Sequence, residues 1–155
     1  MIGGQAGADS IYVSDVRNFL FGAPGSGGID LAALDIFRAR DFGLPMYNDA
    51  REILGLPRVD SFYEVTSNPV IAATLEDLYG HPNNSDALVV GLTEDRKGAV
   101  TGELGTAAIK QHMERLRAGD RFYYGNDDAG FTDEEIEIIS RTTIADIIIR
   151  NSNGM

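Results

Sequence analysis

The chain has 155 residues, of which 43% are apolar, and this length and composition fit about one globular domain. Its 24 acidic and 13 basic side chains give a net charge of -11. This charge argues against nucleic acid and an anionic membrane surface as partners, because both require clustered Lys and Arg. The chain contains no cysteine, which excludes disulfides, thiol catalysis and thiolate-bound metals.

The first nine residues, Met1 to Asp9, are rich in Gly and Ala. They lack the basic and apolar regions of a signal peptide, so we expect a flexible start instead. A start of this kind is also expected of a chain that is part of a longer one. No apolar run reaches the length of a membrane span, and we therefore expect no membrane partner.

Apolar side chains recur at helical spacing through most of the chain, which predicts an all-α array of short helices with long loops. The first helix is predicted over residues 11–20, before a Gly-rich connection. Asp30 is a suitable N-cap for the next helix, which Gly43 and Pro45 end. A shorter helix is predicted over residues 47–54.

Capping signals and apolar runs mark the middle of the chain. Residues 61–64 fit a capping box, and Asn68 followed by Pro69 opens a helix that continues to Leu78. The apolar run over residues 86–92 is compatible with either a helix or a strand, because its periodicity does not separate the two. The polar stretch over residues 94–103 contains Gly and predicts a loop.

Three helices are predicted in the last third of the chain. The first covers residues 106–117, with Gly119 just past its end, and the second follows a capping box at residues 132–135 and continues to Arg141. The last one begins at Thr142 or Thr143. The apolar face of this last helix is large for so short a chain, which favours packing against neighbours outside the chain. A compact bundle formed by the chain itself could also bury this face. The face contains Ile144, Ile147 and Ile148.

The stretch over residues 30–48 contains the candidate site. Asp35 and Arg38 are spaced i, i+3 on a predicted helix, and Leu31 and Leu34 lie on the same face. Charged side chains among leucines are costly to bury unless each has a partner. The pattern by itself is therefore explained most simply by a local Asp35–Arg38 pair on a half-buried face.

The same stretch resembles the signature of animal-type haem peroxidases, D-L-x-x-L-N-I-Q-R-G-R-D-H-G-L-P-x-Y-N. Other segments resemble the family in the same order, and the resemblance covers about residues 10–151. It implies the C-terminal portion of a mainly helical haem peroxidase domain, so that residues 1–155 form a partial domain. The further matching segments are residues 15–22, 78–86, 91–94, 115–124 and 131–151.

The resemblance implies roles for residues that match the signature. Arg38 falls on the arginine that binds a haem propionate, a task that suits a forked guanidinium. Asp35 falls where most members have Asn, whose side chain accepts a hydrogen bond from the ring N–H of the iron-bearing histidine. Leu31 and Leu34 would pack on the haem side, although core packing explains them equally well.

The resemblance also implies parts that this sequence does not contain. The proximal histidine and the distal His–Arg pair of the family lie upstream of the signature, and the residues before it here include no histidine. His81 and His112 match no family ligand. We expect a solvated surface position for His81 in a loop beside Pro82, and a surface or half-buried position for His112. The signature also departs from the family at Phe37, Ala39 and Phe42. We therefore expect the isolated chain neither to hold haem nor to turn over peroxide.

In the complete domain the implied cofactor is haem, and the partners are hydrogen peroxide and the missing N-terminal part of the domain. The implied reaction is peroxide-dependent one-electron or halide oxidation, with an extracellular location and a role in the response to oxidative stress as family-level expectations. Two alternatives remain open. The chain could be a non-catalytic helical binding module derived from the peroxidase fold, or one subunit of a split peroxidase.

Overall fold

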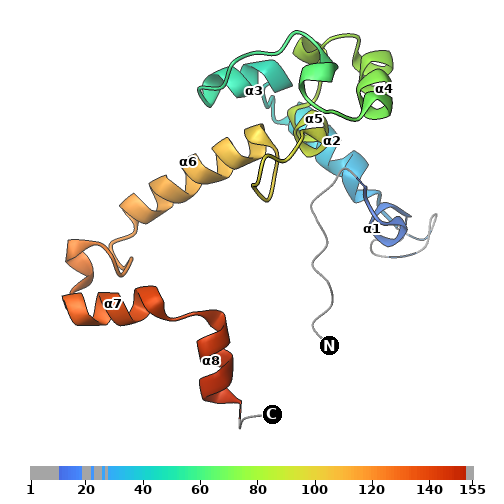
Figure 1. The fold of residues 1–155 in the computed structure, drawn as a ribbon. Coiled ribbons are helices and arrows are strands. Elements are labelled where there is room, and N and C mark those ends of the chain that lie inside the picture. The colour runs from blue at the N-terminus through green and yellow to red at the C-terminus, as the bar shows by residue number, and fades with distance from the viewer. Residues whose placement is uncertain (1–10, 19–21, 23–25, 27, 153–155) are drawn as a thin grey trace. The chain divides into compact units, whose positions relative to one another are not determined.

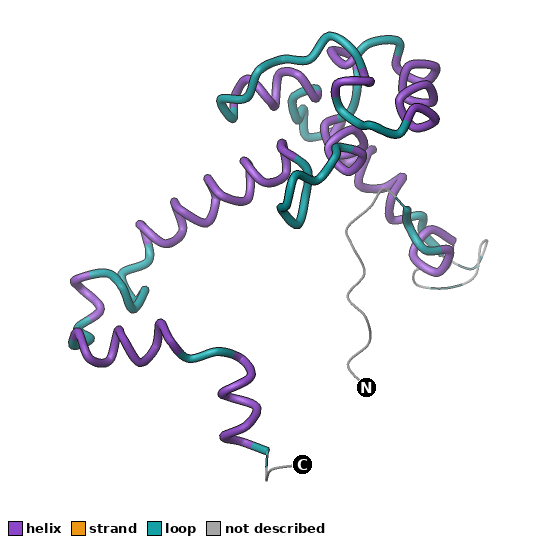
Figure 2. Tube along the Cα trace, in the orientation of Figure 1, coloured by secondary structure: helices purple, strands orange, loops and turns teal. Residues whose placement is uncertain are grey.

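The computed structural model describes residues 11–18, 22, 26 and 28–152. These residues form helices and loops, with no strand among them (Figure 2). An isolated antiparallel bridge joins Met46 to Asp86. The predicted all-α class is confirmed, whereas the expected flexible start, Met1 to Asp9, lies outside the described residues. Within the described ranges, no helix is long and apolar enough to cross a membrane.

The chain divides into two compact units, Met1–Lys110 and Gln111–Met155. In the first unit, three helices, one 3-10 turn and the start of a further helix surround a shared core, and two more helices come before them in the chain (Figure 1). The elements of this unit are α1 (Ser14–Asn18), α2 (Leu31–Asp41), α3 (Tyr47–Ile53), η1 (Phe62–Glu64), α4 (Pro69–Tyr79), η2 (Pro82–Asn84), α5 (Ala87–Thr93) and the start of α6 (Glu103–Gly119).

The core of the first unit lies between α3, η1, α4, α5 and the beginning of α6. Burying one large apolar side chain contributes roughly 1.5–3 kcal/mol, so this cluster is the main source of stability for the segment 46–104. The buried apolar residues are Tyr47, Val59, Phe62, Val65, Ala72, Leu75, Val90 and Leu104.

The helix starts predicted from capping residues are confirmed. The carboxylate of Asp30 accepts a hydrogen bond from the backbone N–H of Ala33 at 3.0 Å, and the amide oxygen of Asn68 accepts one from Val70. Capping boxes are present at Ser61, at Thr132 and at Thr143, which settles the start of the last helix. The ambiguous apolar run is a helix, α5, and not a strand.

Helix α6 begins three residues before the predicted start, at Glu103. The reason is a distant cap, because the backbone N–H of Leu104 donates to the Glu94 carboxylate at 2.7 Å. Glu94 thus satisfies one of the donors that a helix start leaves unpaired. The predicted loop over 94–103 is one residue too long. The helix ends at Gly119, whereas the prediction ended it at Arg117 with Gly119 past its end.

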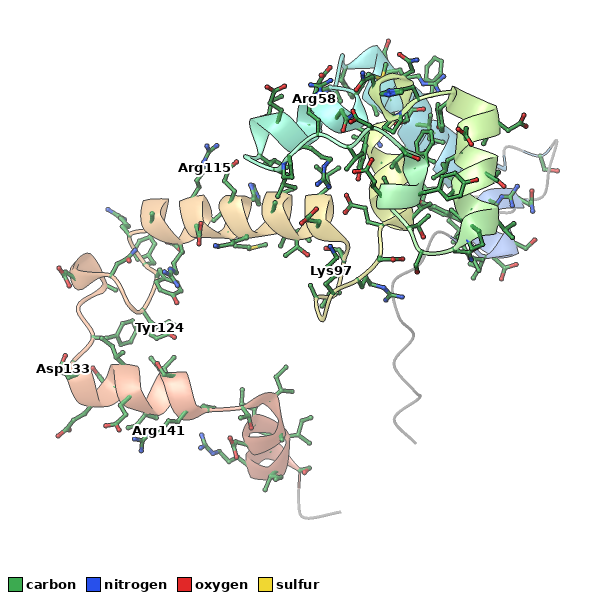
Figure 3. The ribbon with its side chains drawn as sticks, turned by 45° about the horizontal axis from the view of Figure 1, so that its top comes forward. Arg58, Lys97, Arg115, Tyr124, Asp133 and Arg141 are labelled. Atoms are coloured by element: carbon green, nitrogen blue, oxygen red, sulfur yellow. The ribbon has the colours of Figure 1, made fainter. Side chains whose placement is uncertain are left out.

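The second unit contains the rest of α6, followed by η3 (Asp127–Ala129), α7 (Asp133–Arg141) and α8 (Ile144–Asn151). Ser140 donates a hydrogen bond to the hydroxyl of Tyr124, which lies beside α7 in Figure 3. No residue described between 111 and 152 is buried. Amphipathic helices need cover for their apolar faces, and the second unit does not supply that cover by itself. Exposed isoleucines include Ile138, Ile144, Ile147, Ile148 and Ile149.

Candidate functional site

Helix α2 brings the residues that the sequence singled out onto one side. They are spaced i, i+3, i+4 and i+7, which is the repeat of one helix face. The two leucines and the aspartate are half-buried, and the arginine is exposed. This surface, called the candidate face below, consists of Leu31, Leu34, Asp35 and Arg38.

The opposite side of α2 faces its own unit. Ala32 and Ile36 line a cavity of about 350 Å³ together with Leu88 and Leu92 of α5. Because successive helical residues are about 100° apart, these α2 side chains point away from the candidate face. One side of the helix therefore faces this cavity and α5, and the candidate face is directed away from them.

The local ion pair between Asp35 and Arg38 does not form. Among the residues that the structure describes, neither side chain has a hydrogen bond or an ion pair with another group. An exposed i, i+3 pair contributes only about 0.2–0.5 kcal/mol, which is too little to fix two side chains in one geometry. A carboxylate half-buried beside leucines favours a partner outside the described residues.

Arg40, at the end of α2, binds the start of α5 instead. Its Nε donates to Oδ1 of Asp86 at 2.9 Å, and its Nη2 donates to Oδ2 at 2.6 Å. The hydroxyl of Tyr79 donates to the same Oδ2 at 2.9 Å. The Asp86 side chain is only 6% exposed, against 59% for Arg40. A buried carboxylate is thus held by a two-bond guanidinium fork and a phenol.

This contact makes a prediction for the pH dependence of stability. The hydrogen bonds from Arg40 lower the pKa of Asp86 from its ordinary 3.8. A carboxyl with a lowered folded-state pKa adds stability above its unfolded pKa, and this is lost as the pH falls through the folded-state pKa. The difference in free energy of unfolding between the chain and its Arg40→Met variant should therefore be constant near pH 7 and shrink below 3.8.

Chemical denaturation of both proteins from about pH 7 to about pH 2 measures this difference. A difference in free energy of unfolding that stays constant down to the lowest pH would contradict the contact between Arg40 and Asp86.

A second polar cluster is buried inside the core of the first unit. The hydroxyl of Tyr47 donates to Oε1 of Glu94 at 2.6 Å, and Nη1 of Arg51 donates to the same oxygen at 3.0 Å. Nη2 of Arg51 also donates to Glu103 at 2.7 Å. Burial, together with the hydrogen bond to Glu94, raises the pKa of Tyr47. In the part of the chain that is described, every buried side-chain polar atom has a partner.

The side-chain amide of Asn48 forms further buried hydrogen bonds next to this cluster. Its Nδ2 donates to the carbonyl of Val59 at 2.8 Å, and its Oδ1 accepts from the N–H of Val59 at 3.0 Å. Its Nδ2 also donates to Asn83 at 2.7 Å. The Asn48 side chain therefore ties α3 to the loop before η1 and to η2.

Sequence reasoning missed both polar clusters. Arg40 is 46 positions from Asp86, and Arg51 is 43 positions from Glu94, so no local spacing connects them. The sequence did contain one indication. Arg40 lies within the matching segment 30–48, and Asp86 and Glu94 lie within the matching segments 78–86 and 91–94. Pairing polar residues between matched segments would have proposed the contact of Arg40 with Asp86.

The two histidines occupy different environments. His81 is half-buried and not solvated as expected, because its Nδ1 accepts a hydrogen bond from the N–H of Asn83 at 3.1 Å and so caps η2. His112 is exposed on α6. Within the described ranges, no group of three or more His, Cys, Asp or Glu residues is placed to hold a metal ion.

Comparison with known proteins matches the animal haem peroxidase family model over residues 2–155. Peroxinectin A of Dictyostelium discoideum is 38% identical over 156 residues, which cover 100% of this chain and 29% of that protein. Thyroid peroxidase of Sus scrofa is 36% identical over 148 residues, which cover 93% of this chain and 16% of that protein.

Solved structures also match this chain with only part of their own length. Peroxidase A from Dictyostelium discoideum has a TM-score of 0.78 at 38% identity, covering 96% of this chain and 29% of that one. A fatty acid alpha-dioxygenase of Oryza sativa has a TM-score of 0.74 at 29% identity, covering 92% and 25%. The chain spans less than a third of the length of these relatives. Because the family model matches nearly every residue, the chain belongs to the animal haem peroxidase family.

Proposed function

We propose that the chain supplies one side of the haem pocket of a peroxidase, with the candidate face of α2 against the haem. One observation supports this most: Asp35 and Arg38 share a half-buried face with two leucines and have no polar partner among the described residues. Haem has an apolar ring with charged propionates, which complements such a face. The chemistry of these side chains therefore fits the cofactor that the family implies.

Arg38 has the simpler role. Its guanidinium would donate two charge-assisted hydrogen bonds to a propionate and so fix the orientation of the haem in the pocket. Leu31 and Leu34 would exclude water from the ring beside it. Bound haem supplies the peroxide-dependent oxidation, and the protein supplies the binding and the electrostatics.

Asp35 would act through a histidine that lies outside these 155 residues. Its carboxylate would accept a hydrogen bond from the ring N–H of the iron-bearing histidine, which holds the proton on that nitrogen and orients the ring. We place the proximal histidine and the distal His–Arg pair in the remaining part of the domain. The reaction of the complete protein is then peroxide-dependent oxidation, with an extracellular location as the family-level expectation.

The alternative of a self-contained binding module is less well supported. The first unit has its own core, but the second unit has no buried residue among those described. A module that functions alone would bury its apolar helix faces within itself. The chain also spans less than a third of the length of the relatives that it matches, which fits a piece of a larger domain better.

The proposed role of Asp35 predicts a change in redox behaviour. In the complete haem-loaded protein, Asp35→Asn is expected to raise the midpoint potential of the iron. A carboxylate makes the histidine more electron-donating than an amide does, and this stabilises the ferric state. Spectroelectrochemical titration measures the potential, and Asp77→Asn on the exposed side of α4 is the matched control. Equal potentials for Asp35→Asn and the unaltered protein would reject the role.

A further inference from the structure

We propose that Arg40 and Asp86 are positioning residues, whose contact fixes helix α2 to the start of α5 and thereby holds Asp35 and Arg38 at the haem. This inference rests on the function proposed above. It assigns to Arg40 a role that is indirect, since its side chain lies outside the candidate face.

The geometry of the contact restrains orientation as well as distance. Two parallel hydrogen bonds, of 2.9 and 2.6 Å, join the guanidinium of Arg40 to the two carboxylate oxygens of Asp86. A planar fork of this kind permits little rotation of one partner against the other. Asp86 is itself held by Tyr79 at 2.9 Å, so the end of α2 is connected to both α4 and α5.

Packing does not supply the same restraint. A cavity of about 200 Å³ lies between the end of α2 and the start of α5, with Ala39, Leu44 and Leu88 among its lining residues. Side chains that border a cavity lose contacts on that side. Within the described part of the chain, Arg40 is the α2 side chain that hydrogen-bonds to another element. The fork is therefore the side-chain restraint on the helix end.

The backbone after α2 forms a turn and then makes a second connection to the segment before α5. Gly43 adopts a φ of 66° there, and the N–H of Tyr47 donates to the carbonyl of Ser85 at 2.9 Å. These contacts fix the start of α3, while the direction of α2 still depends on the turn and on Arg40. Without the fork, α2 could tilt about this turn.

A tilt of α2 would move the candidate face. Asp35 lies five residues before Arg40, which is about 7.5 Å along a rigid helix at about 1.5 Å per residue. A small rotation at the helix end therefore displaces the carboxylate relative to its proposed histidine partner. Misplacements of about 1 Å are large on the scale of a functional hydrogen bond.

The test uses the complete haem-loaded protein and two readouts, the rate of haem loss and the midpoint potential of the iron. Arg40→Ala is expected to accelerate haem loss by about 10- to 100-fold and to raise the potential, in the same direction as Asp35→Asn. Arg40→Lys keeps the charge but not the fork, so its values should fall between those of the alanine variant and the unaltered protein.

Arg58→Ala is the matched control. Arg58 forms exposed ion pairs with Asp49 and Glu52 and projects from the surface of the first unit (Figure 3). It should change neither the rate of haem loss nor the potential. If Arg40→Ala has reduced helicity by circular dichroism, Arg40→Lys and Tyr79→Phe carry the same test, because each weakens the contact without removing it.

A double variant separates positioning from a general loss of structure. If Arg40 acts through Asp35, Arg40→Ala should shift the potential much less in an Asp35→Asn background than alone. Equal shifts in both backgrounds would overturn the inference for Asp35. If neither readout responds to Arg40→Ala while Asp35→Asn shifts the potential, the proposed function stands and the positioning role is rejected. If Asp35→Asn is inert while Arg40→Ala speeds haem loss, the role of Asp35 fails and the positioning of Arg38 remains.

Discussion

Arg51→Met is expected to destabilise the chain by about 3–5 kcal/mol, because it removes one partner from a buried ion pair. The side chains of Arg51 and Glu94 are 4% and 3% exposed. Without the guanidinium, Glu94 keeps a negative charge in the core with only Tyr47 and the N–H of Leu104 as donors. Urea denaturation followed by circular dichroism measures the change.

Two further variants make this result specific. Arg58→Ala removes two exposed ion pairs and an exposed hydrogen bond to Asn83, and it is expected to leave the urea midpoint nearly unchanged. The double variant Arg51→Met with Glu94→Gln should recover part of the lost stability, because no unpaired charge remains in the core. An Arg51→Met protein as stable as Arg58→Ala would contradict the assigned role of the pair.

Arg38→Ala is expected to weaken haem retention in the complete protein by about 10- to 150-fold. This follows from losing charge-assisted hydrogen bonds to a propionate, which contribute about 1.5–3 kcal/mol. The rate of haem transfer to an excess of an apo-globin acceptor measures the effect. The helix itself should persist, because Ala is a strong helix former and Arg38 is exposed.

Arg38→Lys and Arg115→Ala are the controls for that experiment. Lysine retains the charge without the fork and should give an intermediate rate of haem loss. Arg115 is exposed on α6 and labelled in Figure 3, and its replacement should have no effect. Equal rates for Arg38→Ala and the unaltered protein would remove Arg38 from the haem pocket.

The local chemistry of the chain made most helix boundaries readable from the sequence. Caps such as Asn68 and Thr143 act within three residues, so the letters alone predict them. The run over 86–92 was ambiguous, because its apolar periodicity is shared by buried helices and strands. The start of α6 could not be predicted, because Glu94 provides its cap from nine residues before the helix begins.

The candidate site was predictable to a different extent. The spacing of Leu31, Asp35 and Arg38 defines one face of a helix, and the resemblance to the family gave these residues their proposed roles. The contacts of Arg40 and Arg51 were not predictable from spacing, because their partners come from other elements more than forty positions away. The contact with Asp86 gives Arg40 a structural role, whereas the haem-binding roles proposed within the same signature belong to Asp35 and Arg38.

The proposed placement of the iron ligand outside these 155 residues is tested most directly by a haem titration of the purified chain, followed through the Soret band. The complete protein serves as the positive control, and circular dichroism verifies that the helices are present in the chain. We expect no defined, saturable Soret band from the chain, because His81 caps η2 and neither histidine belongs to the candidate face. A sharp band that saturates with haem and is lost in His81→Ala or His112→Ala would contradict the account.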